Sequence, residues 1–124
     1  MKRNMDLVRL ILKKVEECGH GHGYISFDEG WIEGYSKDEV VYHLKIMDEG
    51  GLIVGVGSNA SSTSGPDYMP MRLTWYGHEV LDGIKNDRIW SEVKKALSKV
   101  GDVASYDVLK ALATKVALGF LGVS

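Results

Sequence analysis

One stretch of the chain, residues 36–53, carries signals for both ends of a helix and for a strand after it. Ser36 followed by Glu39 forms the pattern of a capping box, in which each side chain satisfies a backbone amide left free at the start of a helix. Gly50–Gly51 supplies a left-handed residue that ends the helix, and Leu52–Val54 has the apolar, β-branched character of a strand. The sequence therefore predicts a helix that passes directly into a strand.

Composition sets the class of protein. A chain of 124 residues with 44% apolar residues is long enough to bury the core of one domain. Its single cysteine, Cys18, cannot form an internal disulfide, and the first residues lack an apolar secretory segment, so we expect a cytoplasmic setting. The apolar stretch Val116–Val123 is too short to cross a bilayer, so we expect no membrane association.

Before residue 36, the pattern predicts one helix and then an irregular stretch. Asn4 or Asp6 is placed to cap a helix whose apolar residues recur at spacings of three and four, with Arg9 on the outer side. Residues 24–33 contain glycine, aromatic and β-branched residues and no helical repeat. We expect two short strands there, in place of the first helix of an ordinary helix-turn-helix.

After residue 51, the pattern predicts a two-stranded wing and three helices. The expected strands are Leu52–Val56 and Met71–Trp75, with a mobile tip at residues 57–67 because no large apolar side chain fixes it. Thr74 is the expected cap of the next helix, and Ser105 starts the last one. In the first of these helices Val80, Leu81 and Ile84 are expected to be buried. The apolar positions that mark the other two are Ile89, Trp90, Val93, Leu97, Val100, Leu109, Leu112, Ala113, Val116 and Phe120.

Several motifs together resemble a known family. They are Tyr42-His43-Leu44-Lys45 before Gly51-Leu52-Ile53, Leu73-Thr74-Trp75 with Gly77-His78-Glu79, and Trp90 twelve residues after His78. In this combination the chain is similar to domain-of-unknown-function family 2513, a group of small bacterial and prophage proteins. The resemblance covers nearly the whole chain. It implies a winged-helix-like fold and a bacterial or prophage origin, and it implies no particular activity.

The predicted fold is therefore α+β. Residues 1–84 are expected to form a winged-helix-like core with an abbreviated helix-turn-helix and a small β wing, and residues 85–124 a helical C-terminal extension of the same domain. The first helix and the last two carry long apolar faces that a small sheet cannot cover. We expect a homodimer on this ground, and the alternative is that the last helices fold back on the first.

Charge argues against base reading by the 36–53 helix. With its core face at Val40, Leu44 and Met47, the outward side chains are Asp38, Tyr42, Lys45 and Glu49, which would repel phosphates on balance. The net charge of the whole chain is −2, with 15 basic and 17 acidic side chains. The central part of the chain is the acidic one, and the ends are basic.

Two function classes stay open. The first is an auxiliary DNA-binding transcriptional regulator that contacts double-stranded DNA through basic side chains, for which the candidates are Lys2, Arg3, Lys45, Arg72, Lys94, Lys95 and Lys99. The second is a non-enzymatic protein-protein interaction module, in which Trp31 and Tyr42 contact an unidentified protein partner. Trp75 and Trp90 are expected in the core. The frequent use of winged-helix domains in DNA binding favours the first class.

Metal and catalytic sites receive little support. Cys18, His20 and His22, with His43 or His78, include metal-ligand types, but their spacing matches no usual zinc pattern. No phosphate-binding glycine loop, dinucleotide fingerprint or nucleophile elbow is present. The carboxylates of residues 28–33 are explained more simply as surface side chains. The same explanation serves for the adjacent pair His78 and Glu79. We therefore expect no metal, no cofactor and no enzymatic activity.

Overall fold

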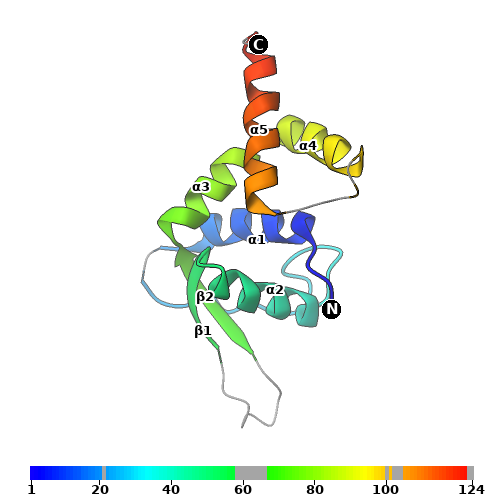
Figure 1. Ribbon diagram of the computed structural model, residues 1–124. Helices are drawn as coiled ribbons and strands as arrows, with labels where there is room; N and C mark the ends of the chain where they lie inside the picture. The colour runs from blue at the N-terminus through cyan, green and yellow to red at the C-terminus, as the bar shows by residue number, and fades with distance from the viewer. Residues whose placement is uncertain (21, 58–66, 100, 102–104, 123–124) are drawn as a thin grey trace. The chain divides into compact units, whose positions relative to one another are not determined.

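The computed structural model describes residues 1–20, 22–57, 67–99, 101 and 105–122. These residues form five helices and a two-stranded antiparallel sheet, which confirms the α+β class (Figure 1). The chain separates into two compact units, which are described in turn. The first unit is Met1–His78 and the second is Glu79–Ser124, so the α3 helix, Trp75–Ile84, begins in the first unit and ends in the second.

The first helix, α1, spans Met5–Cys18. The Asn4 side chain caps it by accepting hydrogen bonds from the backbone amides of Asp6 and Leu7, at 2.9 and 3.3 Å. The prediction that Asn4 or Asp6 is the cap is settled in favour of Asn4. The expected outward position of Arg9 is wrong, because this side chain is buried. The buried apolar side chains of α1 are Leu7, Val8, Ile11, Leu12 and Val15.

The second helix, α2, spans Lys37–Glu49 and has both predicted ends. The amide of Glu39 donates to the Ser36 hydroxyl and the Glu39 carboxylate accepts from the Ser36 amide, each at 3.1 Å, which completes the capping box. At the other end Gly51 has a φ of 77°. The Leu52 amide donates to the Met47 carbonyl at 2.9 Å, the bond that defines a Schellman ending. The local sequence therefore determines where this helix starts and stops.

The wing consists of strands β1, Ile53–Gly57, and β2, Tyr68–Leu73, which pair in antiparallel register. Figure 1 shows α2 leading directly into β1, as predicted. The second strand was predicted too late in the chain, because Trp75 begins α3 and does not belong to the strand. Residues 58–66 of the expected mobile tip lie outside the described residues. The arrangement of α1, α2 and this hairpin is compatible with a winged helix.

The segment between α1 and α2 contains neither of the two predicted strands, although all of residues 24–33 are described. The expected absence of a helix there is confirmed. Only one strand-like hydrogen bond forms, from the Ile25 amide to the Pro70 carbonyl of β2 at 2.7 Å. Proline has no N–H, so Pro70 cannot donate a hydrogen bond back to Ile25. Farther along, Phe27 and Trp31 stack with ring centroids 4.6 Å apart.

Thr74 joins the wing to α3. Its hydroxyl accepts a hydrogen bond from the Gly77 amide at 2.9 Å, which confirms it as the cap, and donates to the Gly51 carbonyl at 2.5 Å. Its backbone amide donates to the Leu52 carbonyl at 3.0 Å. A Cβ at position 77 would overlap that Leu52 carbonyl oxygen, so the first turn of α3 can approach the end of α2 only with glycine there.

The second unit contains the end of α3 together with α4, Asp87–Lys99, and α5, Tyr106–Phe120. Helices α4 and α5 lie side by side (Figure 1). The predicted Ser105 cap is confirmed, since its hydroxyl accepts from the Val108 amide. Val80, Leu81, Ile84, Trp90, Val93, Leu97, Leu109 and Ala113 are buried as expected, and Ile89, Leu112 and Val116 are half-buried.

Phe120, the last of the apolar positions named for α5, lies at the surface. The side chain is 46% exposed, and the Arg88 guanidinium lies 4.5 Å from its ring centroid. The expectation for Val100 lies outside the described residues. None of the helices formed by the described residues is long and apolar enough to cross a membrane.

Candidate functional site

The exposed face of α2 is acidic, as the sequence analysis predicted. Asp38, Tyr42 and Glu49 are exposed, whereas Lys45 is half-buried. Val41 is buried. An exposed surface with this charge would face DNA phosphates with net repulsion.

His43 of α2 is a buried polar side chain that is only 1% exposed. Its Nε2 accepts a hydrogen bond from the Asn4 amide at 2.8 Å, and its Nδ1 lies 2.8 Å from the Glu39 carbonyl. This pattern fits the neutral tautomer with a proton on Nδ1, because Nε2 must accept and Nδ1 must donate. The imidazole therefore ties the start of α1 to α2, and neither ring nitrogen is available as a metal ligand.

A buried tyrosine joins the wing to the end of α2. Tyr68 of β2 is 3% exposed and its hydroxyl donates to the Asp48 carboxylate at 2.6 Å. Burial raises the pKa of the Tyr68 phenol far above its usual range, and the hydrogen bond to Asp48 and the charge of that carboxylate raise it further. This contact has a structural explanation and needs no catalytic one.

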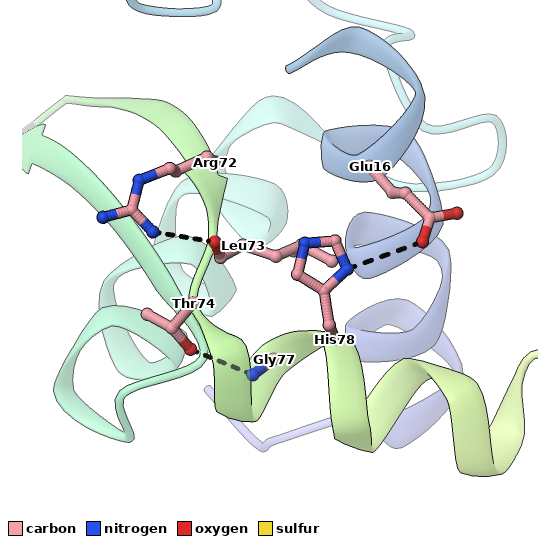
Figure 2. Close-up of polar contacts among 6 residues, drawn as sticks. All are labelled: Glu16, Arg72, Leu73, Thr74, Gly77 and His78. Carbon is pink, nitrogen blue, oxygen red and sulfur yellow. Dashed lines mark hydrogen bonds and ion pairs between the residues drawn. The ribbon is translucent and has the colours of Figure 1, made fainter. Parts of the chain in front are cut away.

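Arg72, a predicted DNA contact, borders a surface hollow of about 440 Å³ in the first unit. We call this the Arg72 hollow, and it is lined by Val15, Glu16, Gly19, Arg72, Leu73, Trp75 and His78. Figure 2 shows the His78 ring directed toward Glu16 of α1, with Nδ1 3.7 Å from the carboxylate. The Arg72 guanidinium donates to the Leu73 carbonyl at 3.1 Å. The hollow therefore holds one permanent cation and one carboxylate.

The three tryptophans differ in exposure in a way the sequence analysis did not anticipate. Trp90 is buried as expected, but Trp75 is 81% exposed, so its assignment to the core is wrong. Trp31, the predicted partner contact, is half-buried and stacks on Phe27. Tyr42, the other predicted contact, is exposed and meets the His43 ring edge-on. The aromatic side chain most available for contact is therefore Trp75.

The second unit brings lysines from two helices around one hollow of about 610 Å³. We call it the lysine hollow, and its lining residues are Glu92, Lys95, Ala96, Ser98, Lys99, Leu112, Lys115 and Val116. The lining therefore contains three lysines and one carboxylate together with apolar side chains. Lys95 and Glu92 form an exposed ion pair at 3.1 Å, a kind of pair that contributes little to stability.

The predicted basic residues are divided between the two units. Lys2 and Arg3 are exposed ahead of α1, and Lys45 and Arg72 also belong to the first unit. Lys94, Lys95 and Lys99 are exposed on α4, but only the last two line the lysine hollow. The sequence analysis missed Lys115. Its signal was its place close to Leu112 and Val116, the half-buried side chains of α5 that line the same hollow.

The residues considered for metal binding or catalysis do not assemble in the part of the chain that is described. There, no group of three or more His, Cys, Asp or Glu side chains is placed to hold a metal ion. His78 pairs with Glu16, and Glu29 accepts a hydrogen bond from the Lys37 amide at 2.8 Å at the start of α2. Cys18 is half-buried at the end of α1. His78 and Glu29 therefore each take part in a contact within the first unit.

Comparison with known proteins agrees with the motifs. The family described as "Hypothetical protein (DUF2513)" matches residues 2–103. The chain belongs to this family. It is also 34% identical over 116 residues to an "Uncharacterized protein" of Haemophilus influenzae, covering 94% of this chain and 95% of that protein. No solved structure matches the chain. The DUF2513 match includes all of α1 to α4 and ends before α5.

Proposed function

We propose that this DUF2513 protein is an auxiliary DNA-binding regulator that holds duplex phosphates with lysines of its second unit and does not read bases with α2. The observation that carries the proposal is the lysine hollow, where Lys95, Lys99 and Lys115 surround one surface. Neutralising phosphates supplies most of the affinity of nonspecific DNA binding and needs no base contacts. A bacterial or prophage setting, which the family resemblance implies, is compatible with this use.

The geometry of the lysines supports the proposal. Lys95 and Lys99 are four residues apart on α4 and therefore lie on one helical face, with Lys115 contributed by the neighbouring α5. All three are exposed, so contact with phosphates requires no burial of charge. The Glu92 carboxylate is the one opposing charge, and its exposed pair with Lys95 is weak enough for phosphates to replace it.

The test is duplex binding measured across a salt series. Each lysine that neutralises a phosphate contributes about 0.9 to the slope of log affinity against log salt. The triple variant Lys95→Glu/Lys99→Glu/Lys115→Glu should abolish retardation of duplex DNA at low salt. Lys45→Ala on α2 is the control and should leave affinity within about twofold, because that side chain is half-buried on an acidic helix.

Two results would contradict the proposal. Wild-type protein that fails to retard DNA at low salt would remove DNA binding altogether. Loss of binding in Lys45→Ala with full binding in the triple variant would mean instead that α2 enters the groove. Circular dichroism of each variant checks that the helices are retained.

A second candidate function is a protein-protein interaction module, and the exposure of Trp75 favours it. An indole that is 81% exposed beside an arginine has the composition of an interface hot spot. Tyr42 and the carboxylates of α2 supply a further surface on the same unit. Capture of a partner by wild type, its loss with Trp75→Ala and its retention with Tyr76→Ala would support this function. Equal capture by all three proteins would contradict it.

A further inference from the structure

Helix α5 has many apolar side chains, but few of them are buried. It spans Tyr106–Phe120, yet only Leu109 and Ala113 of this helix are buried. Leu118 is 39% exposed, Phe120 is 46% exposed and Leu121, just past the helix, is 76% exposed. Helices in proteins gain most of their stability from packing an apolar face, and contiguous exposed apolar side chains mark interaction surfaces.

A groove lies beside this surface within the second unit. It has a volume of about 460 Å³ and lies between the end of α3 and α5. We call it the α3–α5 groove, and its apolar lining consists of Val80, Ile84, Ile89, Ala113, Ala117 and Leu118. The apolar end of α5 and an apolar groove are therefore next to each other on one unit.

The rim of the α3–α5 groove carries both signs of charge. Asp82 and Glu79 line it from α3, and Lys110 lines it from α5. Asp82 and Lys110 are both exposed. A two-fold interface must be self-complementary, because the same surface meets itself with the two halves exchanged. This rim has that property, since the basic side chain of α5 in one copy can meet the acidic side chain of α3 in the other.

We propose that the α3–α5 groove is the contact surface of a homodimer, in which the apolar end of α5 of each copy packs into the groove of its partner. Leu118 and Leu121 are the apolar anchors, and Asp82 of each copy faces Lys110 of the other. The sequence analysis expected a homodimer from apolar faces in general, and this inference assigns it to one surface. It is independent of DNA binding, which uses the lysine hollow.

Sedimentation velocity over a micromolar to submillimolar concentration series tests the dimer. Wild type should shift from a 13.7 kDa species to one of about twice that mass. Leu118→Glu/Leu121→Glu should remain monomeric with an unchanged circular dichroism spectrum. Lys99→Glu, a charge change in the lysine hollow, is the control and should dimerise like wild type. A monomeric wild type, or a dimer that survives the double leucine variant, would overturn the proposal.

Exchanging the charges of Asp82 and Lys110 in separate variants tests the two-fold arrangement. Recovery of association in a mixture of the two variants would show that each of them is folded. Asp82→Lys alone places lysine against lysine in its homodimer, and Lys110→Glu alone places carboxylate against carboxylate, so each should dimerise about tenfold more weakly. An equimolar mixture should regain wild-type association, because the heterodimer pairs opposite charges at both contacts. A mixture that associates no better than either variant alone would contradict the proposed arrangement.

Discussion

Helices α2 and α5 are similar in length and in how they begin, but they differ in what they do with their side chains. Each starts at a serine whose hydroxyl accepts an amide hydrogen bond. Of 13 residues in α2, five are buried, whereas α5 buries two of 15. The exposed residues of α2 are mostly acidic, and those of α5 include large apolar side chains and lysines. Helix α2 therefore packs much of its surface inside its unit, whereas most of the surface of α5 is exposed.

This difference changes what the winged-helix resemblance implies. In such a fold the helix before the wing is the expected reader of DNA. Here that helix is held at both ends and along its length by contacts within the first unit, and its exposed charge opposes phosphates. The lysine hollow and the α3–α5 groove, on which the two proposals rest, both lie on the second unit.

The largest expected effect tests how tightly α2 and α3 are joined. Gly77→Ala places a methyl group against the Leu52 carbonyl oxygen and should lower the free energy of unfolding by about 3 kcal/mol or more, because backbone must move to accommodate it. Gly83→Ala in the same helix is the control. Nothing lies near its added Cβ, so it should be neutral or stabilise by up to about 1 kcal/mol. Equal effects in urea denaturation would refute the close approach.

The next effect concerns the buried imidazole of α2. His43→Leu keeps the volume but leaves the Asn4 amide without its acceptor, which should cost about 1–3 kcal/mol of unfolding free energy. Tyr42→Leu, a neighbouring substitution on the exposed face, should change stability by less than about 0.5 kcal/mol. Chemical denaturation measures both. A neutral His43→Leu would show that the link between α1 and α2 does not depend on these hydrogen bonds.

Alkaline pH probes the contact between α2 and the wing. Because the pKa of Tyr68 is raised on folding, the folded protein holds this proton more tightly than the unfolded chain. Its stabilising effect is full below the ordinary tyrosine pKa of about 10 and is lost as pH rises toward the folded pKa. Tyr68→Phe should cost about 1 kcal/mol at neutral pH and make the decline of stability above about pH 10 shallower. Tyr24→Phe, an exposed control, should match wild type.

The smallest effect compares the two serine caps. Ser36→Ala should cost about 1 kcal/mol in unfolding free energy, since it removes one half of the capping box of a well-packed helix. Ser105→Ala removes the same kind of bond from α5, where few side chains are buried, and should mainly increase amide hydrogen exchange in the first turn of that helix. A larger loss of global stability in Ser105→Ala would reverse the contrast between the helices.

Sequence patterns predicted the features that depend on local chemistry. The capping box at Ser36, the left-handed ending at Gly51 and the cap at Thr74 each arise from residues close together in the chain, and the structure has all three. Helical spacing also identified the buried faces of α3 and α4, because one period determines which residues share a face.

The errors came from contacts between distant residues. The strands expected at residues 24–33 do not form, and Ile25 instead donates a hydrogen bond to Pro70, far away in the sequence. The burial of Arg9 and the exposure of Trp75 depend on which surfaces neighbouring elements cover. Lys115 lies near Lys95 and Lys99 because α5 packs beside α4, so the order of charges along the chain could not identify it.

Thr74 makes two hydrogen bonds to the residues that follow α2, and these have a consequence for how this family can vary. Its amide and hydroxyl donate hydrogen bonds to the carbonyls of Leu52 and Gly51, so the hairpin is closed at its base. For a loop closed in this way, doubling its length costs only about 0.6 kcal/mol of chain entropy. Insertions between Gly57 and Tyr68 should therefore leave the base of the wing unchanged, and relatives can lengthen or shorten that segment at little cost to folding.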